Sequence, residues 1–135
     1  MVEAAQDVKS PPQPIEPDQI TAADIESNRL YGTGCTLVPV NMPGGNPVVI
    51  ANGQRAFVKL AGKFVTFAAD PGSPEIGLGV RAHYVGKAQS LALVRGSGRG
   101  TALGQDGMRW DGRVEIRDAA DRVIWSSAGD LTCGQ

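Results

Sequence analysis

Residues 113–126, RVEIRDAADRVIWS, decide the fold class, because they predict two short strands joined by a tight turn. Val114 and Ile116 alternate with charged side chains, which is the two-residue period of a strand that buries one face. The segment DAAD, residues 118–121, has the polar composition of a turn. Residues 122–126 then return as a second strand, in which we expect Val123 and Trp125 to be buried. The stretch therefore predicts a β-hairpin.

The same pattern recurs over most of the chain before this hairpin. Asn52-Gly53 and Ala61-Gly62 are turn dipeptides between apolar runs, and 18 glycines in 135 residues indicate many turns. Further strands are predicted at residues 35–40, 48–51, 55–60, 64–68, 80–85, 90–95 and 130–134. About eight short strands, spaced roughly 8–12 residues apart, are typical of an all-β sandwich or barrel. We expect an antiparallel barrel or sandwich, and the pattern leaves the choice between them open.

One helix and one spacer are predicted before the first strand. Thr21 followed by Asp24 has the spacing of a helix N-cap, so a short helix is expected within residues 20–30. Residues 1–19 are acidic and hold four of the nine prolines, at positions 11, 12, 14 and 17. Such a segment buries too little apolar surface to order itself and acts as an extended spacer. The predicted organisation is a disordered spacer at 1–19 and a single β domain at 20–135.

The two cysteines, Cys35 and Cys133, stand near the two ends of the predicted domain. They do not form a C-x-x-C pair, which argues against a thioredoxin-like or zinc-ribbon site. If joined, they close a loop of about 100 residues and tie the first strand to the last, a constraint of roughly 4–5 kcal/mol. Two buried, unpaired thiols are the alternative.

The spacer and the cysteines together indicate the cellular compartment of the protein. No apolar run is long enough to span a membrane, and no charged start followed by an apolar stretch is present. A spacer at the start of a chain suggests that a signal sequence or lipid anchor preceded it in a precursor. We therefore expect a periplasmic or cell-envelope protein. A plain disordered tail is the alternative.

Chemical signatures are sparse. His83 is the only histidine, so neither a nucleophile–base pair nor a zinc site is indicated. The glycine-rich residues 96–100 lack the Lys-Ser/Thr ending of a phosphate-binding loop, and the aspartates at 106, 111, 118 and 121 match no EF-hand spacing. A net charge of −1 and 5% aromatic residues do not indicate a nucleic-acid partner. We predict no cofactor, no metal and no catalytic residue.

A surface for binding is the remaining candidate site. Arg81, His83 and Tyr84 are predicted to lie in an exposed segment, although Tyr84 also shares the apolar face of Val80 in the predicted strand. Residues 96–107 form the loosest predicted region, and Arg99 lies within it. Trp110, in a predicted loop at 106–112, is either a core residue or a ligand stacker. The candidate binding residues are Arg81, His83, Tyr84, Arg99 and Trp110.

Several short motifs carry a resemblance to a known family. They are the Gly34-Cys35 pair, VVIANG at 48–53, FVKLAGKFV at 57–65, DG and RVEIRDAADRV at 111–123, and LTCG at 131–134. Over about residues 15–135 the chain resembles a family of small bacterial lipoproteins of unassigned function. These have a lipobox, a Pro/Glu/Ala-rich spacer and a domain bounded by Gly-Cys and Cys-Gly. The resemblance implies an exported protein, lipid-anchored in its precursor, although neither the signal nor the lipid-bearing cysteine is present here.

Three functions are compatible with these observations. The first is a non-catalytic envelope module that binds a protein or a cell-wall component. The second is an inhibitor resembling the small β-barrel lysozyme inhibitors, suggested by size, strand count and the segment at 81–84. The third is a small hydrolase that uses carboxylates near Trp110, with Asp106 and Asp111 as the residues to test. Nothing in the sequence indicates an oligomeric state.

Overall fold

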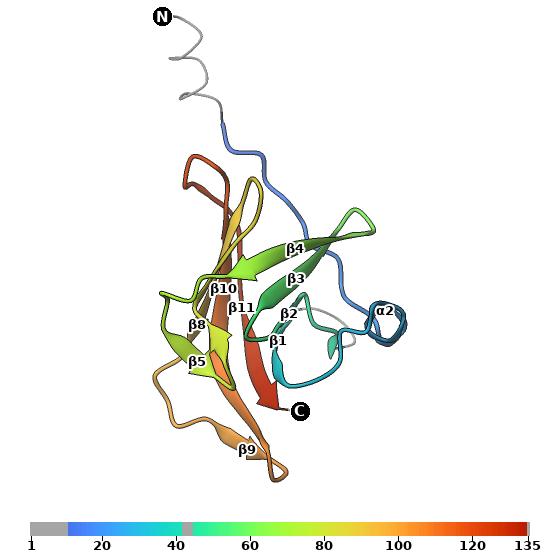
Figure 1. Cartoon of the computed structure of the whole chain (residues 1–135), viewed down its shortest axis with the longest axis vertical. Helices are drawn as coiled ribbons and strands as arrows, with labels where there is room; N and C mark the ends of the chain where they lie inside the picture. Colours follow the sequence, from blue (N-terminus) through green and yellow to red (C-terminus); the bar gives the residue numbers. More distant parts are fainter. Residues whose placement is uncertain (1–10, 42–44, 135) are drawn as a thin grey trace, which may run out of the picture.

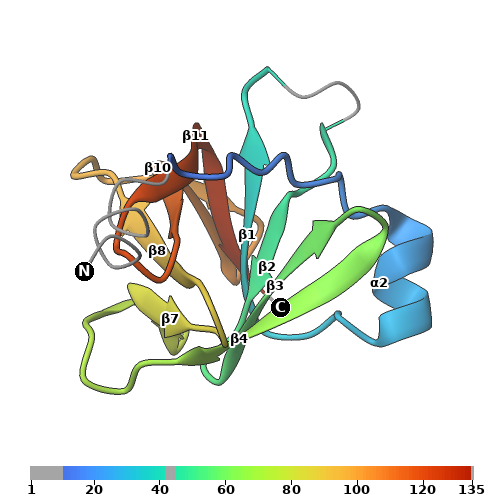
Figure 2. The same cartoon turned by 90° about the horizontal axis from the view of Figure 1, so that it is seen from above.

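The described part of the chain folds as a closed antiparallel β-barrel with one short helix outside it (Figure 1). The computed structural model describes residues 11–41 and 45–134. Within them, eight strands form the barrel in the order β1-β2-β3-β4-β7-β8-β10-β11, and β11 pairs again with β1. Figure 2 shows this ring of strands from above. The all-β prediction is confirmed, and the architecture is a barrel and not a sandwich.

The strand bounds follow the turns that the sequence marks. The barrel strands are β1 (Gly34–Pro39), β2 (Val49–Ala51), β3 (Arg55–Leu60), β4 (Lys63–Ala69), β7 (His83–Val85), β8 (Ser90–Arg95), β10 (Gly107–Arg117) and β11 (Val123–Gly134). Three short strands lie outside the ring: β5 (Glu75–Gly77) and β6 (Val80–Arg81), which pair with each other, and β9 (Thr101–Leu103), which pairs with β10.

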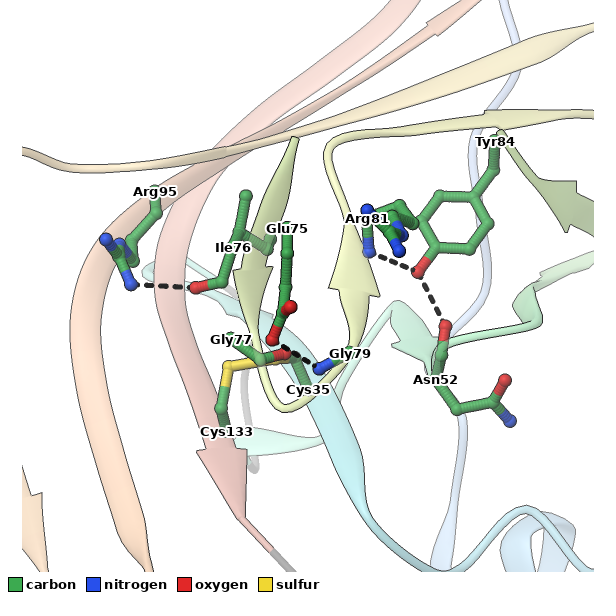
Figure 3. Close-up of a disulfide and its surroundings, with 10 residues drawn as sticks. All are labelled: Cys35, Asn52, Glu75, Ile76, Gly77, Gly79, Arg81, Tyr84, Arg95 and Cys133. Atoms are coloured by element: carbon green, nitrogen blue, oxygen red, sulfur yellow. Dashed lines mark hydrogen bonds between the residues drawn. A yellow bond between two sulfur atoms is a disulfide. The ribbon is translucent and has the colours of Figure 1, made fainter. Parts of the chain in front are cut away.

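The first and last strands close the barrel. Cys35 of β1 lies directly opposite Cys133 of β11, and the two form a disulfide with a Cα–Cα distance of 4.0 Å. The predicted disulfide is confirmed, as is its place between the first and last strands. The β5–β6 hairpin lies over this region, with Gly77 next to the disulfide (Figure 3).

The interior of the barrel is filled by one side of each strand. Leu37, Val58, Leu91, Val114 and Ile116 are fully buried in one continuous core. This alternation is the reason why the strands were predictable: each presents apolar side chains inward at every second position. Burial of these side chains away from water is the main stabilising contribution to such a barrel.

The helix is α2 (Ala22–Asn28), which lies outside the ring of strands in Figures 1 and 2. The Thr21 hydroxyl accepts from the Asp24 N–H, and the Asp24 carboxylate accepts from the Thr21 N–H. This reciprocal capping box satisfies two N–H groups that a helix start leaves unpaired. The predicted N-cap is confirmed. No helix in the described part of the chain is long and apolar enough to cross a membrane.

The segment before the helix differs from the expected spacer. The first ten residues lie outside the described part of the chain, but residues 11–19 run along the barrel. The Ile15 N–H donates to the Ile124 carbonyl at 3.3 Å, and the Asp18 N–H donates to the Lys59 carbonyl at 2.7 Å. Pro17 is buried. The barrel therefore makes contacts with the segment assigned to the spacer, because Ile15, between two of its prolines, packs against the core.

Several strand predictions need correction. The strands predicted separately at 122–126 and 130–134 are one strand, β11. The predicted strand at 80–85 breaks at Ala82, whose N–H donates to Pro74 while its carbonyl accepts from Leu93. Ala82 thus marks the change from pairing with β5 to pairing with β8. The prediction that Val123 is buried is also wrong, because a β-bulge shifts the register between Ile116 and Arg117. Val123 is exposed, Ile124 is buried, and Trp125 packs partly buried against the core.

Candidate functional site

A hollow of about 650 Å³ opens on the outer face of the barrel beside the loop between β8 and β9. Its floor is formed by the middle of β10 and the neighbouring position of β11. The lining residues are Gly96, Ser97, Gly98, Arg99, Gly100, Thr101, Arg109, Trp110, Asp111 and Asp130. Its volume lies within the roughly 300–1,000 Å³ range of ligand sites.

The loop is fixed at both ends by contacts with β10. The Gly96 N–H donates to the Asp111 carbonyl at 2.7 Å. At the other end, Gly100 has a φ of +79°, and an added Cβ there would overlap the indole nitrogen of Trp110. A glycine is therefore required at position 100, because the backbone is left-handed there and because Trp110 leaves no space for a side chain.

Trp110 belongs to strand β10 and not to a loop, which corrects the prediction for residues 106–112. It pairs with the buried Leu131 across the sheet and packs partly buried against the core. The Arg95 guanidinium lies 4.7 Å from the centroid of the Trp110 ring, and its Nη1 donates to the Ile76 carbonyl at 2.8 Å (Figure 3). With Arg95 and Gly100 both in contact with its ring, Trp110 is a rigid wall of the hollow.

Two carboxylates face each other on the floor of the hollow. Asp111 of β10 lies directly opposite Asp130 of β11 in the antiparallel register. The Cβ atoms of such a pair are about 4.5–5.5 Å apart, and like charges at this distance destabilise a sheet. A cation bound between the two carboxylates would remove this repulsion.

Two arginines complete the charged lining. Arg109 lies on β10 two residues before Asp111, and Arg99 lies in the loop. None of the side chains of Arg99, Arg109, Asp111 and Asp130 forms an ion pair or hydrogen bond with another described residue. On the same strand, by contrast, Glu115 pairs with Arg113 at 3.5 Å and with Arg117 at 3.2 Å. The hollow thus offers two positive and two negative groups for a ligand.

The predicted segment at 81–84 does not join this hollow. Tyr84 is fully buried, and its hydroxyl donates to the Asn52 carbonyl at 2.6 Å and accepts from the Arg81 N–H at 2.9 Å (Figure 3). Burial raises the pKa of Tyr84. This corrects the expectation that Tyr84 is exposed: it is a core residue whose polar end is satisfied by backbone groups.

Arg81 and His83 lie at the surface but are engaged locally. The Arg81 Nη1 donates to the Ser73 carbonyl at 3.0 Å, and His83 Nδ1 lies 3.1 Å from Asp70 Oδ2. The Gly72 N–H, and next the His83 side chain, lower the pKa of Asp70. Of the five candidate binding residues, only Arg99 and Trp110 line the hollow.

Arg109 and Asp130 were not among the binding residues predicted from the sequence, although a signal was present. Arg109, Trp110 and Asp111 alternate charged and apolar side chains, which is the strand period that continues from residue 113 upstream. Asp130 stands in a predicted strand next to Leu131, on the opposite face. Only the pairing of β10 with β11 places Asp130 beside Asp111.

Across residues 11–41 and 45–134, no three His, Cys, Asp or Glu side chains gather as they do in a metal site.

No protein-family model matches the chain, and neither does any curated protein or solved structure. The hollow and its unpaired charges are therefore the features from which a function can be argued.

Proposed function

We propose that the protein is a non-catalytic binding module of the cell envelope, which holds a cell-wall component or a protein segment in the hollow over β10 and β11. The observation that carries this proposal is the set of four charged side chains that have no partner in the described part of the chain. Charged groups left unpaired around a concave surface are suited to a ligand of complementary charge.

The arrangement favours a ligand that carries both signs of charge. A carboxylate fits Arg99 or Arg109, because a guanidinium can donate two parallel hydrogen bonds to it. An ammonium group fits between Asp111 and Asp130, where it would relieve the repulsion of the facing carboxylates. Peptides with free amino and carboxyl groups, including the stem peptides of bacterial cell walls, have this chemistry.

An exported location is part of the same proposal. The disulfide between Cys35 and Cys133 supports an oxidising compartment, because such bonds are rare in the cytosol. A periplasmic or envelope location would place the hollow within reach of the cell wall. A lipid anchor in the precursor, attached before the segment that runs along the barrel, is compatible with this location.

A fluorescence titration tests the proposal, because Trp110 lines the hollow. In a Trp125→Phe background, the stem tripeptide of alanine, γ-linked glutamate and diaminopimelate should change the emission of Trp110 in a saturable way. Arg109→Gln and Asp130→Asn should each weaken binding about tenfold, as expected when a charged hydrogen bond is lost. Added salt should weaken binding as well, since the groups are partly exposed.

Arg55→Gln is the matched control for these variants. Arg55 is exposed on β3, outside the hollow, and its side chain has no partner among the residues described. It should bind the tripeptide as the parent does. Equal affinities of the parent, Arg109→Gln and Asp130→Asn would contradict the proposal, as would the absence of any saturable change.

A small hydrolase is the second candidate, favoured by one observation. The register places Asp111 opposite Asp130, and two facing carboxylates are a common arrangement for acid–base catalysis. Under this alternative, Asp111→Asn would abolish turnover of a glycan or peptide substrate while leaving its binding intact. Asp106 lies in the turn before β10 and not in the hollow, so Asp106→Asn serves as the control.

A further inference from the structure

A second hollow lies beside α2 and borders the first one on β11, where Thr132 lines it two residues after Asp130. The helix is held at its start by an ion pair between Lys59 Nζ and Asp24 Oδ2 at 2.9 Å. Just before it, the buried Ile20 donates its N–H to the Pro47 carbonyl at 2.8 Å. No residue of α2 itself is buried. The helix therefore contacts the barrel through its first turn, and space remains between the barrel and the later residues of the helix.

This space is a cleft of about 350 Å³ between the segment after α2 and the outer face of β11, β1 and β2. It is lined by Ile25, Leu30, Tyr31, Gly32, Thr33, Gly34, Cys35, Thr36, Ile50, Ala51, Asn52, Thr132 and Gly134. None of these residues is charged. A neighbouring hollow of about 410 Å³ shares Ile25 and Tyr31 with it. The absence of charge in the lining contrasts with the four charged groups over β10 and β11.

Three threonine hydroxyls are among the polar groups of the cleft, beside the Tyr31 hydroxyl and the Asn52 amide. Thr36 pairs across the sheet with Thr132 on one side and with Ile50 on the other, so the three form a row across the outer face. The hydroxyls of Thr33, Thr36 and Thr132 make no hydrogen bond with another residue of the described chain, and none is sealed away from solvent. These hydroxyls can each donate to and accept from a ligand.

An exposed aromatic ring stands at the rim. Tyr31 is 67% exposed, although it belongs to the type of residue that usually buries its ring. Its neighbours Ile25 and Leu30 are half-buried and add apolar surface. The cleft therefore combines an apolar wall, a free aromatic ring and a row of hydroxyls.

We propose that this cleft binds an uncharged sugar ring. The apolar C–H face of the sugar would pack on Tyr31, and its hydroxyls would exchange hydrogen bonds with Thr36 and Thr132. An anionic ligand lacks a cation in this lining, and an acyl chain would leave the hydroxyls unpaired, which costs free energy. The inference goes beyond the peptide-binding hollow, since it depends on other side chains and on a lining that carries no charge.

The test is an amide-proton NMR titration of the full chain with N,N′,N″-triacetylchitotriose, an uncharged sugar trimer. Saturable shifts should appear at residues lining the cleft. Tyr31→Ala should weaken binding about tenfold or more, and Tyr31→Phe should preserve it, because the ring is retained. Thr36→Val should weaken binding about five- to tenfold, the loss expected for one ligand hydrogen bond.

Two controls separate this site from the rest of the surface. Thr66→Val removes an exposed strand hydroxyl from β4, outside the cleft, and should bind the trimer as the parent does. Arg99→Gln, in the loop of the other hollow, should also leave sugar binding unchanged, so that failure of the peptide proposal and of this one are distinguishable. Shifts confined to the hollow over β10, the absence of saturable shifts, or equal binding by Tyr31→Ala would overturn the inference.

Discussion

Gly100 is the residue on which the shape of the hollow over β10 depends. Its left-handed φ of +79° and the indole of Trp110 leave no room for a side chain. The sequence marked residues 96–107 as glycine-rich and loose, but it could not distinguish one glycine from another. Gly98, two positions earlier, has nothing within 4 Å of an added Cβ, so the two glycines differ only through the tertiary structure.

Gly100→Ala should therefore destabilise the fold or displace the loop, whereas Gly98→Ala should be almost neutral. The expected loss for Gly100→Ala is about 1–3 kcal/mol, from the left-handed backbone and the overlap with Trp110. Thermal unfolding measures the loss, and the emission of Trp110 in a Trp125→Phe background measures the change of its surroundings. Equal melting temperatures of the two variants would contradict this account of Gly100.

The β10–β11 hairpin is the element that supplies the floor of the candidate site and three of its four charged side chains. Its turn is organised by Asp118, whose carboxylate accepts from the N–H groups of Ala120 and Arg122 and from the Arg122 side chain at 3.0 Å. The Arg122 N–H is the main reason why the pKa of Asp118 lies below its ordinary value of 3.8. The predicted turn at 118–121 is thus confirmed, with a residue-specific cause.

Asp118 should make the stability of the protein pH-dependent in acid. A carboxyl with a lowered folded-state pKa stabilises the fold fully above its unfolded-state pKa, and this contribution is lost as the pH falls through the folded-state value. Asp118→Asn should therefore reduce stability near neutral pH and narrow the difference from the parent below pH 3.8, the ordinary pKa of the group. Urea unfolding at several pH values checks this. A constant difference between the two proteins at every pH would contradict it.

The same element shows what local sequence patterns can and cannot predict. Alternation identified Val114 and Ile116 as inward, because burial on one face leaves a period of two. The bulge that exposes Val123 was not predictable, since it depends on the register between two strands. The facing of Asp111 and Asp130 depends on the same register. Hence the strands beside the turn could be predicted, whereas the part of β10 that carries Arg109 and Asp111 was predicted as a loop, and the contact between the charges could not be predicted.

At the scale of the whole molecule, the barrel closes where the disulfide lies, between β1 and β11. Composition and turn spacing predicted many short strands but not whether the sheet closes, because closure is a property of long-range pairing. The burial of Tyr84 could not be predicted from the sequence either, because a tyrosine suits both a surface and a core. Its burial depends on the Asn52 carbonyl, which comes from a distant turn.

Removal of the disulfide should destabilise the barrel without changing its topology. The bond spans a sequence separation of 98, and a loop of this size contributes roughly 4–5 kcal/mol by restricting the unfolded chain. The double variant Cys35→Ala/Cys133→Ala should show this loss in urea unfolding at unchanged strand content by circular dichroism. A reductant should reproduce the loss in the parent and have no effect on the variant. Identical unfolding midpoints would contradict the prediction.

The position of the disulfide also determines how the protein responds to mechanical tension. Cys35 and Cys133 lie at the two ends of the barrel sequence, so a force applied between the chain termini passes through the S–S bond and bypasses the strands between them. Only the residues before Cys35 and after Cys133 can then lengthen. In the reduced protein the same force would unravel the barrel and release roughly 330 Å of chain. Under such a load the hollow over β10 and β11 would stay intact, because its lining lies between the two cysteines, whereas the cleft beside α2 would open, because residues 25–34 of its lining precede Cys35.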